Sequence, residues 1–328
     1  MKAFEGYMKG VNFGGWLSQC DHTKEVYDTF ITAEDFENVV KMGFDHVRLP
    51  IDYELILGEN GEFKEDGFRY IDFAIEECRR NGLNMVLDLH RTPGYSFDPF
   101  HNEKGLFDSE ELQGIFLNIW RELARRYSGN SDILALELLN EVTSIDYMDT
   151  WNELAGKTLA IIREYSKDIK VLLGGYNNNS VEAVGAIRIF DDENIVYNFH
   201  FYEPLIFTHQ GAFWIATMDT GFRCRFDMTY GEYEKYSQKY LCQAYSDFTK
   251  YDLNSKIDIR FFENLIKDAV KIAEERNVPL YCGEYGVIDL ADKEEAAKWH
   301  AMFDEVMDKY KIGHAIWSYR QMNFGLVD

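Results

Sequence analysis

The chain has 328 residues, and its 34 Lys and Arg against 57 Asp and Glu give a formal net charge of −23. This acidity disfavours binding to nucleic acid or to an anionic membrane surface, because both require clustered Lys and Arg. With 46% hydrophobic residues the chain can bury a sizeable core, which excludes wholesale disorder. The length fits either two ordinary domains or one large α/β barrel.

In chain order, short apolar runs alternate with longer stretches of helical periodicity. Near-continuous apolar runs are typical of parallel strands that are buried on both faces. In the helical stretches apolar residues recur every three or four positions, as Ile115, Ile119 and Leu123 do. The sequence predicts strands over 11–16, 46–51, 85–90, 133–141, 170–176, 195–202, 279–287 and 313–319, and helices over 32–42, 68–81, 110–127, 147–165, 181–190, 261–276 and 294–310.

Eight strands alternating with helices predict an α/β fold, either a (β/α)8 TIM barrel or a doubly wound sheet. The barrel is favoured because no Gly-x-Gly-x-x-Gly follows the first strand, where Gly14 and Gly15 are adjacent. We expect residues 1–328 to form a single catalytic barrel domain with an insertion subdomain at 203–258, after strand six. This segment is far longer than an ordinary βα loop, which usually has about 2–6 residues. After 319 the sequence leaves no room for a final helix.

The insertion at 203–258 is rich in aromatic residues. Tyr233, Tyr236 and Tyr240 are spaced to share one helical face. For most of its tyrosines we expect a small core of the subdomain's own. The insertion itself is expected to form a wall over the catalytic face, because all βα loops of a barrel emerge there. Trp120, Trp151 and Trp299 lie in predicted helices and are expected to pack in the core.

The cysteines and the N-terminus bear on cellular location. Five widely spaced cysteines without a Cys-x-x-Cys pair favour free thiols in a reducing compartment. Only Cys224 and Cys242 share one irregular segment, so a bridge between them stays open. The N-terminus carries Glu5 early and lacks the apolar stretch of a secretory signal. The protein is therefore expected to be cytoplasmic, or secreted after removal of a signal.

Polar side chains follow the apolar part of six predicted strands, at the carboxyl ends where barrel enzymes place their chemistry. A charged residue in an apolar strand is costly to bury without a partner. Six strands with polar residues at equivalent positions therefore favour a functional site. These residues are Arg48 near the end of strand two, Asp88 and His90 at the end of strand three, Asn140 and Glu141 at the end of strand four, His200 and Tyr202 at the end of strand six, Glu284 in strand seven and Ser318 in strand eight.

Two of these residues, Glu141 and Glu284, end strands that face each other across a barrel. Two opposed carboxylates can act as general acid and base or as nucleophile and acid. One alternative is a pair of structural salt bridges, and another is a metal site with Asp88, His90 and His200. No His-x-His or His-Glu-x-x-His spacing supports the metal site, so neither a metal nor a cofactor is expected.

The segments around these residues resemble glycoside hydrolase family 5, whose members are retaining barrel glycosidases with the acid/base and the nucleophile at the ends of strands four and seven. The resemblance covers nearly the whole chain and is greatest to the clostridial endoglucanase type, which also has an insertion after strand six. An Asn-Glu pair alone is weakly specific, but the ordered set is highly specific. The segments are 12–16, 46–50, 87–90, 138–141, 198–202, 281–286 and 317–319.

The resemblance implies a role for each matching residue. Glu141 is expected to be the general acid/base and Glu284 the nucleophile. Arg48 would keep Glu284 ionised and Tyr202 would donate a hydrogen bond to it, while His200 would lie beside Glu141. The two carboxylates must differ in environment, since one has to be protonated while the other is charged.

Further residues are expected to bind the sugar. The resemblance implies that Asn140 bonds the 2-hydroxyl, that His90 contacts the sugar and that the sugar stacks on Trp317. Trp214, in the insertion, is a candidate platform for a distal sugar. Relatives often have two consecutive histidines after strand three, whereas this chain has Arg91 in the second position.

The expected activity is endo-acting hydrolysis of β-1,4-glucan, in cellulose or mixed-linkage β-glucan, by retaining double displacement. The expected partner is a β-glucan polysaccharide or oligosaccharide, with no nucleic acid and no membrane, and the protein is expected to be a monomer. The same mechanism on mannan or xylan is an alternative. A sugar-binding barrel without catalysis and a metal-dependent barrel enzyme are others; the intact Glu141 and Glu284 argue against the first.

Overall fold

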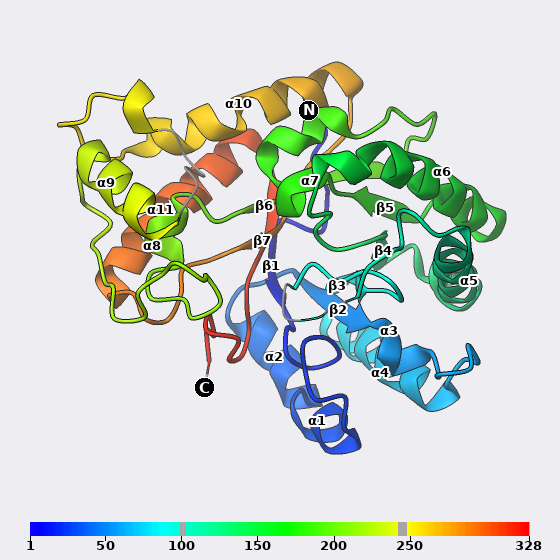
Figure 1. Cartoon of the computed structure of the whole chain (residues 1–328). Helices are drawn as coiled ribbons and strands as arrows, with labels where there is room; N and C mark the ends of the chain where they lie inside the picture. Colours follow the sequence, from blue (N-terminus) through cyan, green and yellow to red (C-terminus); the bar gives the residue numbers. More distant parts are fainter. Residues whose placement is uncertain (99–100, 102, 242–247, 328) are drawn as a thin grey trace.

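The computed structural model describes residues 1–98, 101, 103–241 and 248–327. All eight strands pair in parallel and close into a barrel in the order β1 to β8 (Figure 1). The predicted (β/α)8 barrel is therefore confirmed. The strands are β1 (Lys9–Asn12), β2 (His46–Asp52), β3 (Asn84–Arg91), β4 (Leu134–Glu137), β5 (Lys170–Leu173), β6 (Ile195–Phe201), β7 (Leu280–Tyr285) and β8 (Gly313–Ile316).

The helices surround the barrel (Figure 1). They are α1 (Lys24–Thr29), α2 (Ala33–Lys41), α3 (Tyr53–Ile56), α4 (Glu65–Asn81), α5 (Glu110–Tyr127), α6 (Met148–Tyr165), α7 (Tyr176–Asn179), α8 (Leu205–Thr208), α9 (Tyr230–Tyr240), α10 (Ile259–Arg276) and α11 (Lys293–Tyr310). Short 3-10 helices are η1 (Ser128–Asn130), η2 (Ile145–Tyr147), η3 (Val181–Ala186) and η4 (Phe248–Lys250). None of the helices in the described ranges is both long and apolar enough to cross a bilayer.

Local sequence signals set several helix ends. At the start of α2 the backbone N–H of Thr32 donates to Asp35 Oδ2 over 2.8 Å, which satisfies a donor that the helix itself cannot pair. The same reciprocal cap opens α9 with Thr229 and Glu232. The helix α4 ends at Gly82, whose φ of 70° is readily adopted by glycine.

Several strands stop earlier than the sequence predicts, among them three early ones and β8, which ends at Ile316 instead of 319. The strands β1, β4 and β5 end at Asn12, Glu137 and Leu173, whereas the predicted runs continue to 16, 141 and 176. The residues beyond these strand ends stay apolar because they remain buried. They no longer pair with a neighbouring strand and belong to the βα loops. Asn140 keeps a single backbone bond to β3, from its N–H to the carbonyl of Leu89.

The predicted helix over 181–190 is wrong in type and length, since the chain forms only the 3-10 helix η3 there. The guanidinium of Arg276, at the end of α10, donates to the carbonyl oxygens of Gly185 and Ile187 over 3.0 and 2.7 Å. Carbonyls bound in this way satisfy their hydrogen-bonding needs without a further helical turn. The contacts with α10, and not the helical propensity of the segment, therefore decide its conformation.

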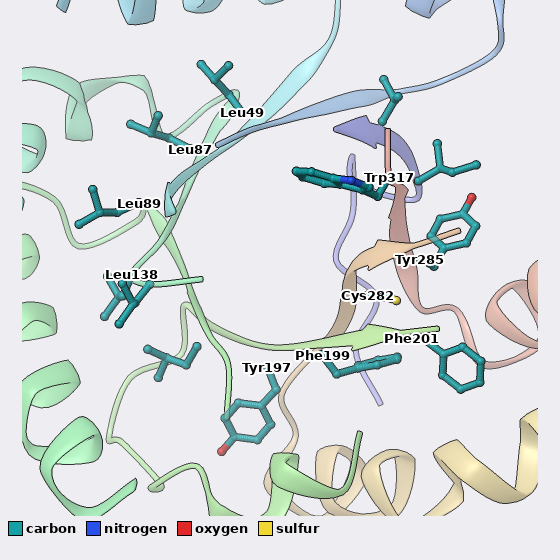
Figure 2. Packing of buried hydrophobic residues seen from close by; sticks show 14 of the residues in the cluster. Leu49, Leu87, Leu89, Leu138, Tyr197, Phe199, Phe201, Cys282, Tyr285 and Trp317 are labelled. Atoms are coloured by element: carbon teal, nitrogen blue, oxygen red, sulfur yellow. The ribbon is translucent and has the colours of Figure 1, made fainter. Parts of the chain in front are cut away.

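The interior of the barrel changes from apolar to polar along its axis. At the amino ends of the strands, a cluster fills the interior with side chains from β3 to β8, closed by the stacked rings of Phe4 and Tyr7. Toward the carboxyl ends the buried side chains are polar. Figure 2 shows Leu87, Leu89 and Phe199 pointing outward from the strands, whereas Trp317 extends into the space that the strands enclose. This polar end is where the candidate site lies.

The segment 203–258 contains α8, α9 and η4 and lies at one side of the barrel, beside α11 (Figure 1). Its own aromatic core includes Tyr230 and Tyr251, stacked 4.3 Å apart, and the fully buried Tyr233. The N–H of Phe226 donates to Glu295 of α11, which attaches the segment to the barrel. The expectation that most tyrosines pack within the insertion is confirmed for these residues. The open question of a Cys224–Cys242 bridge, like Tyr245, lies outside the described residues.

Beyond β8 the chain forms turns across the catalytic face, and no helix occurs among the described residues up to 327. Phe324 contacts the rings of Tyr202 and His209 at 5.9 and 5.3 Å. Arg320 pairs with Asp35 of α2 over 3.0 Å. The tail therefore joins the start of the chain to the insertion, in the place where an eighth helix would otherwise follow.

Candidate active site

Arg48 lies at the centre of the polar end of the barrel. It is fully buried, and its guanidinium donates to Glu137 through Nε and Nη2, over 2.7 and 2.9 Å. Nη1 donates to Glu284 Oε1 over 2.8 Å, and Nη2 lies 2.9 Å from Asp88 Oδ2. Burial disfavours the charge of Arg48, but these three carboxylates raise its pKa well above the ordinary value. Arg48 is therefore a permanent cation.

Glu284 lies within β7 and receives hydrogen bonds at both carboxylate oxygens. Arg48 donates to Oε1, and the hydroxyl of Tyr202 donates to Oε2 over 3.0 Å. Burial, and the negative charge of Glu284, raise the pKa of Tyr202 well above its usual value, so its hydroxyl remains a donor. Donors on both oxygens therefore fix the orientation of the Glu284 carboxylate.

Glu141 lies beyond the end of β4 in a left-handed backbone conformation, with φ of 44°. His200 Nδ1 lies 2.7 Å from Oε1, and the side-chain amide of Asn178 donates to Oε2 over 2.9 Å. Burial raises the pKa of Glu141, and the hydrogen bond from Asn178 offsets part of that rise. Because burial also lowers the pKa of His200 to about 4, the imidazole is neutral near pH 7. A raised carboxyl pKa suits a residue that must give up a proton.

The two carboxyl groups face each other across a short gap. One oxygen of Glu141, one of Glu284 and a nitrogen of His200 all lie within 4.8 Å of one another. Retaining glycosidases place their two carboxyl groups about 5–5.5 Å apart, whereas inverting enzymes need about 6.5–9.5 Å for an intervening water. The geometry therefore fits a nucleophile and an acid/base acting directly on one bond.

Donors and rings surround the gap. The carboxamide oxygen of Asn140 accepts from Arg48 over 2.8 Å, while its buried Nδ2 has no hydrogen-bond partner among the described residues. His90 is oriented by Asp88, with 2.6 Å between Nδ1 and Oδ2. The rings of His90 and Trp317 are parallel, with centroids 5.8 Å apart. Asn140 thus presents an unused donor, and Trp317 presents a flat apolar face.

Three buried tryptophans in the surrounding helices hold the ends of strands that carry this site. Their indole N–H groups donate to backbone carbonyls: Trp120 to Leu138, Trp151 to Gly174, and Trp299 to Glu203, each over 3.0 Å. The predicted core positions of Trp120, Trp151 and Trp299 are confirmed. Their hydrogen bonds also fix the βα turns from which the functional side chains extend.

Trp214 lies at the rim of the site and is not in contact with the carboxyl pair. Its ring centroid is 6.0 Å from that of His209 and 6.3 Å from that of Phe324. His209 in turn packs edge-on against Tyr202 at 5.0 Å. A continuous set of rings therefore connects half-buried Trp214 to the hydroxyl that supports Glu284.

Two groups of side chains have ligand atoms close enough to hold a metal ion, in the part of the chain that the structure describes. One is Glu141, His200 and Glu284, and the other is His22, Asp52 and Glu54. The set considered from the sequence, Asp88 with His90 and His200, is not one of them. In the second group the Asp52 carboxylate already pairs with Arg91 over 3.2 Å. A metal ion bound to Asp52 would therefore compete with the guanidinium of Arg91 for the same carboxylate.

Comparison with known proteins decides the family. A family model described as cellulase (glycosyl hydrolase family 5) matches residues 7–323. The chain belongs to glycosyl hydrolase family 5. Cellodextrinase A of Ruminococcus flavefaciens is 40% identical over 307 residues, covering 94% of this chain and 84% of the relative. Endoglucanase C of Acetivibrio thermocellus is 39% identical over 330 residues, covering 97% and 92%.

A solved structure agrees with this family assignment. The crystal structure of an endoglucanase from the hyperthermophilic Thermotoga maritima matches with a TM-score of 0.77 at 25% identity, and the match covers 98% of this chain and 93% of that one. The architecture of family 5 is therefore preserved over 98% of the chain.

Arg91, the departure from the family pattern, is almost fully buried in a cluster of charged side chains. Its guanidinium pairs with Asp52 and Glu54 and donates to His101 Nδ1 over 2.8 Å. His22 lies in the same cluster, 3.3 Å from Asp52. Arg91 therefore has charged partners at the wall of the site, a role that a second histidine could not fill with the same geometry.

Some residues of the site escaped the sequence analysis. Glu137 forms the bidentate pair with Arg48. Its position as a lone carboxylate in an apolar strand could have identified it from the sequence. Asn12 holds the carbonyl of Gly283 and accepts from Arg48. Asn178 bonds Glu141, and its signal was the run of three asparagines after strand five.

Proposed function

We propose that the protein is a retaining endo-β-1,4-glucanase in which Glu284 is the nucleophile and Glu141 the general acid/base. The observation that carries the proposal is the carboxyl pair, with ligand atoms of Glu141, Glu284 and His200 within 4.8 Å of one another. The unequal environments of the two groups support unequal roles. Glu284 accepts hydrogen bonds from the guanidinium of Arg48 and the hydroxyl of Tyr202, whereas Glu141 has neutral partners and a pKa that burial raises.

In the first step, Glu141 gives its proton to the glycosidic oxygen while Glu284 attacks the anomeric carbon. The bond to the leaving sugar breaks, and a covalent glycosyl-enzyme forms through Glu284. The developing positive charge on the sugar is stabilised by the carboxylate of Glu284. Arg48 holds that carboxylate in place, since its other donors are bound to Glu137 and Asn140.

In the second step, Glu141 is ionised and removes a proton from a water molecule that attacks the same carbon. The ester bond to Glu284 breaks and the carboxylate is regenerated, which gives net retention of configuration. Neutralising Glu284 in the intermediate removes a negative charge next to Glu141. The pKa of Glu141 is then expected to fall, which turns the acid into a base.

The sugar is held by groups whose hydrogen-bonding capacity is unused within the protein. Asn140 Nδ2 is a buried donor without a partner in the described chain, and it can bond the 2-hydroxyl as charge develops. Trp317 extends into the barrel mouth (Figure 2). Its flat face can stack on the apolar side of the sugar ring. Trp214 is proposed as a platform for a more distant sugar on the side of Tyr202.

The names of the relatives support a β-1,4-glucan as the substrate. Two of the most similar proteins carry the names endoglucanase C and cellodextrinase A. These names differ in the chain length they imply, so both long glucans and short cellodextrins are tested. Mannan and xylan are alternative substrates for the same mechanism, and a sugar-binding barrel without catalysis is the alternative from another class.

The first experiment tests the chemistry. The initial product from a β-1,4-glucan is followed by proton NMR, and the β-anomer is expected first. Glu284→Gln and Glu141→Gln should each abolish turnover of the polymer while the folded structure is kept. Initial α-anomer would overturn the retaining mechanism, and a fully active Glu284→Gln enzyme would remove Glu284 from the chemistry.

The second experiment tests the substrate class. Reducing-sugar release is compared on carboxymethyl cellulose, barley β-glucan, mannan, xylan and cellodextrins, with EDTA present in a parallel series. Activity on the two glucans above mannan and xylan supports the proposal. Binding of every glycan without release of sugar would favour the sugar-binding barrel, and loss of activity in EDTA would favour a metal-dependent enzyme.

A further inference from the structure

Three consecutive asparagines after β5 lie in the single turn α7, where their backbone is left-handed and not α-helical, beside the site. Asn177, Asn178 and Asn179 have φ of 48°, 57° and 55°. Left-handed residues cost free energy for most side chains, and asparagine tolerates them better than most. Three in succession mark a turn whose shape is imposed by its surroundings, and such turns concentrate at functional sites.

This turn reaches the Glu141 carboxyl from the solvent side. The Asn178 side-chain amide donates to Oε2 over 2.9 Å, and the backbone N–H of the same residue donates to the carbonyl of Val142 over 3.0 Å. Asn179 is buried, with its amide nitrogen 3.5 Å from His200 Nε2. The opposite ring nitrogen, Nδ1, lies against Glu141 Oε1. Both oxygens of Glu141 are therefore within reach of this turn, one directly and one through His200.

We propose that Asn178 is a positioning residue that tunes proton release by Glu141. The inference rests on the proposed function, because it assigns Asn178 a task only if Glu141 cycles between acid and base. The amide donates to Oε2 when Glu141 is ionised. Rotation of the same amide by half a turn presents its oxygen to a protonated carboxyl, so both states of Glu141 keep a partner.

Among the described residues, Asn178 and His200 are the side chains that hydrogen-bond the Glu141 carboxyl. Hydrogen bonding from Asn178 favours the ionised form and opposes the pKa rise that burial causes. Charges of His90 and Arg48 act in the same direction as Asn178. The titratable groups that surround Glu141 are Arg48 on β2, Asp88 and His90 on β3, Tyr95 after β3, His200 and Tyr202 at the end of β6, and Glu284 on β7.

Asn177 supplies a matched control. It has the same residue type and the same left-handed backbone region and directly precedes Asn178, but its amide donates to Glu182 over 3.1 Å instead of Glu141. Glycine adopts left-handed conformations freely. Asn178→Gly and Asn177→Gly therefore make the same backbone change, and only the first removes the contact to Glu141.

The test is the pH dependence of kcat/KM on a β-1,4-glucan. Loss of the donor raises the pKa of Glu141, so Asn178→Gly should move the alkaline limb upward by about 0.5–1 pH unit. Asn178→Asp, which places a like charge beside Glu141, should move it further. Asn177→Gly should reproduce the wild-type profile. An Asn178→Gly profile that superimposes on the Asn177→Gly profile would overturn the proposal.

A direct titration separates this inference from the proposed function. With 13C-labelled glutamate, the Glu141 carboxyl resonance is assigned by its loss in Glu141→Gln and followed against pH in the absence of substrate. An upward shift of its midpoint in Asn178→Gly, and none in Asn177→Gly, supports the inference even if no glycan is hydrolysed. An unchanged midpoint in an enzyme that does hydrolyse glucan would reject the inference and leave the proposed function intact.

Discussion

The two carboxyl groups of the site are held in different ways. Glu284 belongs to a strand, and its oxygens are bound by Arg48 and Tyr202. Glu141 lies four residues beyond the last residue of β4, in a left-handed conformation, and its oxygens contact His200 and the exposed Asn178. One carboxyl group thus lies in the sheet and is bound by a permanent cation, whereas the other lies in a loop and is bound by neutral groups, one of them from β6.

This difference matches the role that is proposed for each group. A nucleophile needs a fixed direction and a stable charge, which a strand and a saturated guanidinium network provide. An acid/base must exist in two protonation states, so neutral partners that can donate or accept suit it better than a permanent cation. Four predictions test this contrast. It lies between the Glu284 side, which is Arg48, Tyr202 and Glu284, and the Glu141 side, which is Glu141, Asn178 and His200.

The largest effect is expected at Arg48. In Arg48→Lys, one ammonium group replaces a planar fork that binds Glu137, Glu284 and Asn140 simultaneously. The free energy of unfolding should fall by about 3–5 kcal/mol, because a buried carboxylate loses its partner, and kcat/KM should fall by at least about 100-fold. Urea denaturation and initial rates measure both. Arg188→Lys, in an exposed pair with Glu153, should change neither by much.

A smaller loss is expected at the second donor to Glu284. Tyr202→Phe removes the hydrogen bond to Oε2 and keeps the ring contacts with His209 and Phe324. The kcat value should fall by about 10–100-fold, the equivalent of one hydrogen bond to a charged group. Unchanged kcat in a folded variant would show that Arg48 alone orients Glu284.

On the Glu141 side, the buried imidazole makes stability depend on pH. Burial lowers the pKa of His200 to about 4 in the folded protein, against 6.5 as its ordinary value. Between these two values the unfolded chain binds the extra proton, so the stability that is present above pH 6.5 is lost as the pH falls toward 4. At pH 5 the loss from this group is about 2 kcal/mol. Urea denaturation at pH 5 and 7 should show a correspondingly smaller difference in His200→Gln, and equal differences would contradict the prediction.

The smallest effect is expected at the rim. Trp214→Ala removes an aromatic face that lies apart from both carboxyl groups, so KM for long cellodextrins should rise several-fold while kcat is nearly unchanged. Short substrates that do not reach the rim should be hydrolysed as before. Phe213→Ala, at the neighbouring and more exposed ring, is the comparison. A larger KM increase in Phe213→Ala than in Trp214→Ala would place the platform on Phe213.

The sequence predicted the strand-borne part of the site well. Arg48 and Glu284 lie within buried apolar strands and Tyr202 directly follows one, so each polar residue contrasts with its apolar neighbours. Glu137 and Asn12 lie in strands of the same kind and were nevertheless missed. The Glu141 side was predicted less completely. Glu141 and His200 were identified, but Asn178 was missed, because a polar residue in a polar loop carries no such contrast.

The fold was predictable for the same reason, and the elements that were predicted wrongly have physical causes. Alternation of apolar runs and helical periodicity gave eight strands in a closed barrel, since burial on both faces imposes a continuous apolar run on each strand. The ends of β1 and β4 were placed too late, because residues beyond a strand can stay buried without pairing. The 3-10 helix η3 was mistaken for an α-helix, because Arg276 of α10, distant in sequence, binds its carbonyl groups.

The sequence by itself thus determined the order of elements, the family pattern and the two acidic residues that face each other. Only the tertiary structure decided how those carboxyl groups differ. The pKa of Glu141 depends on burial and on hydrogen bonds from Asn178, and the support of Glu284 depends on donors from β2 and the end of β6. Such contacts join residues that are far apart in the chain, and no local pattern of residue types encodes their distances.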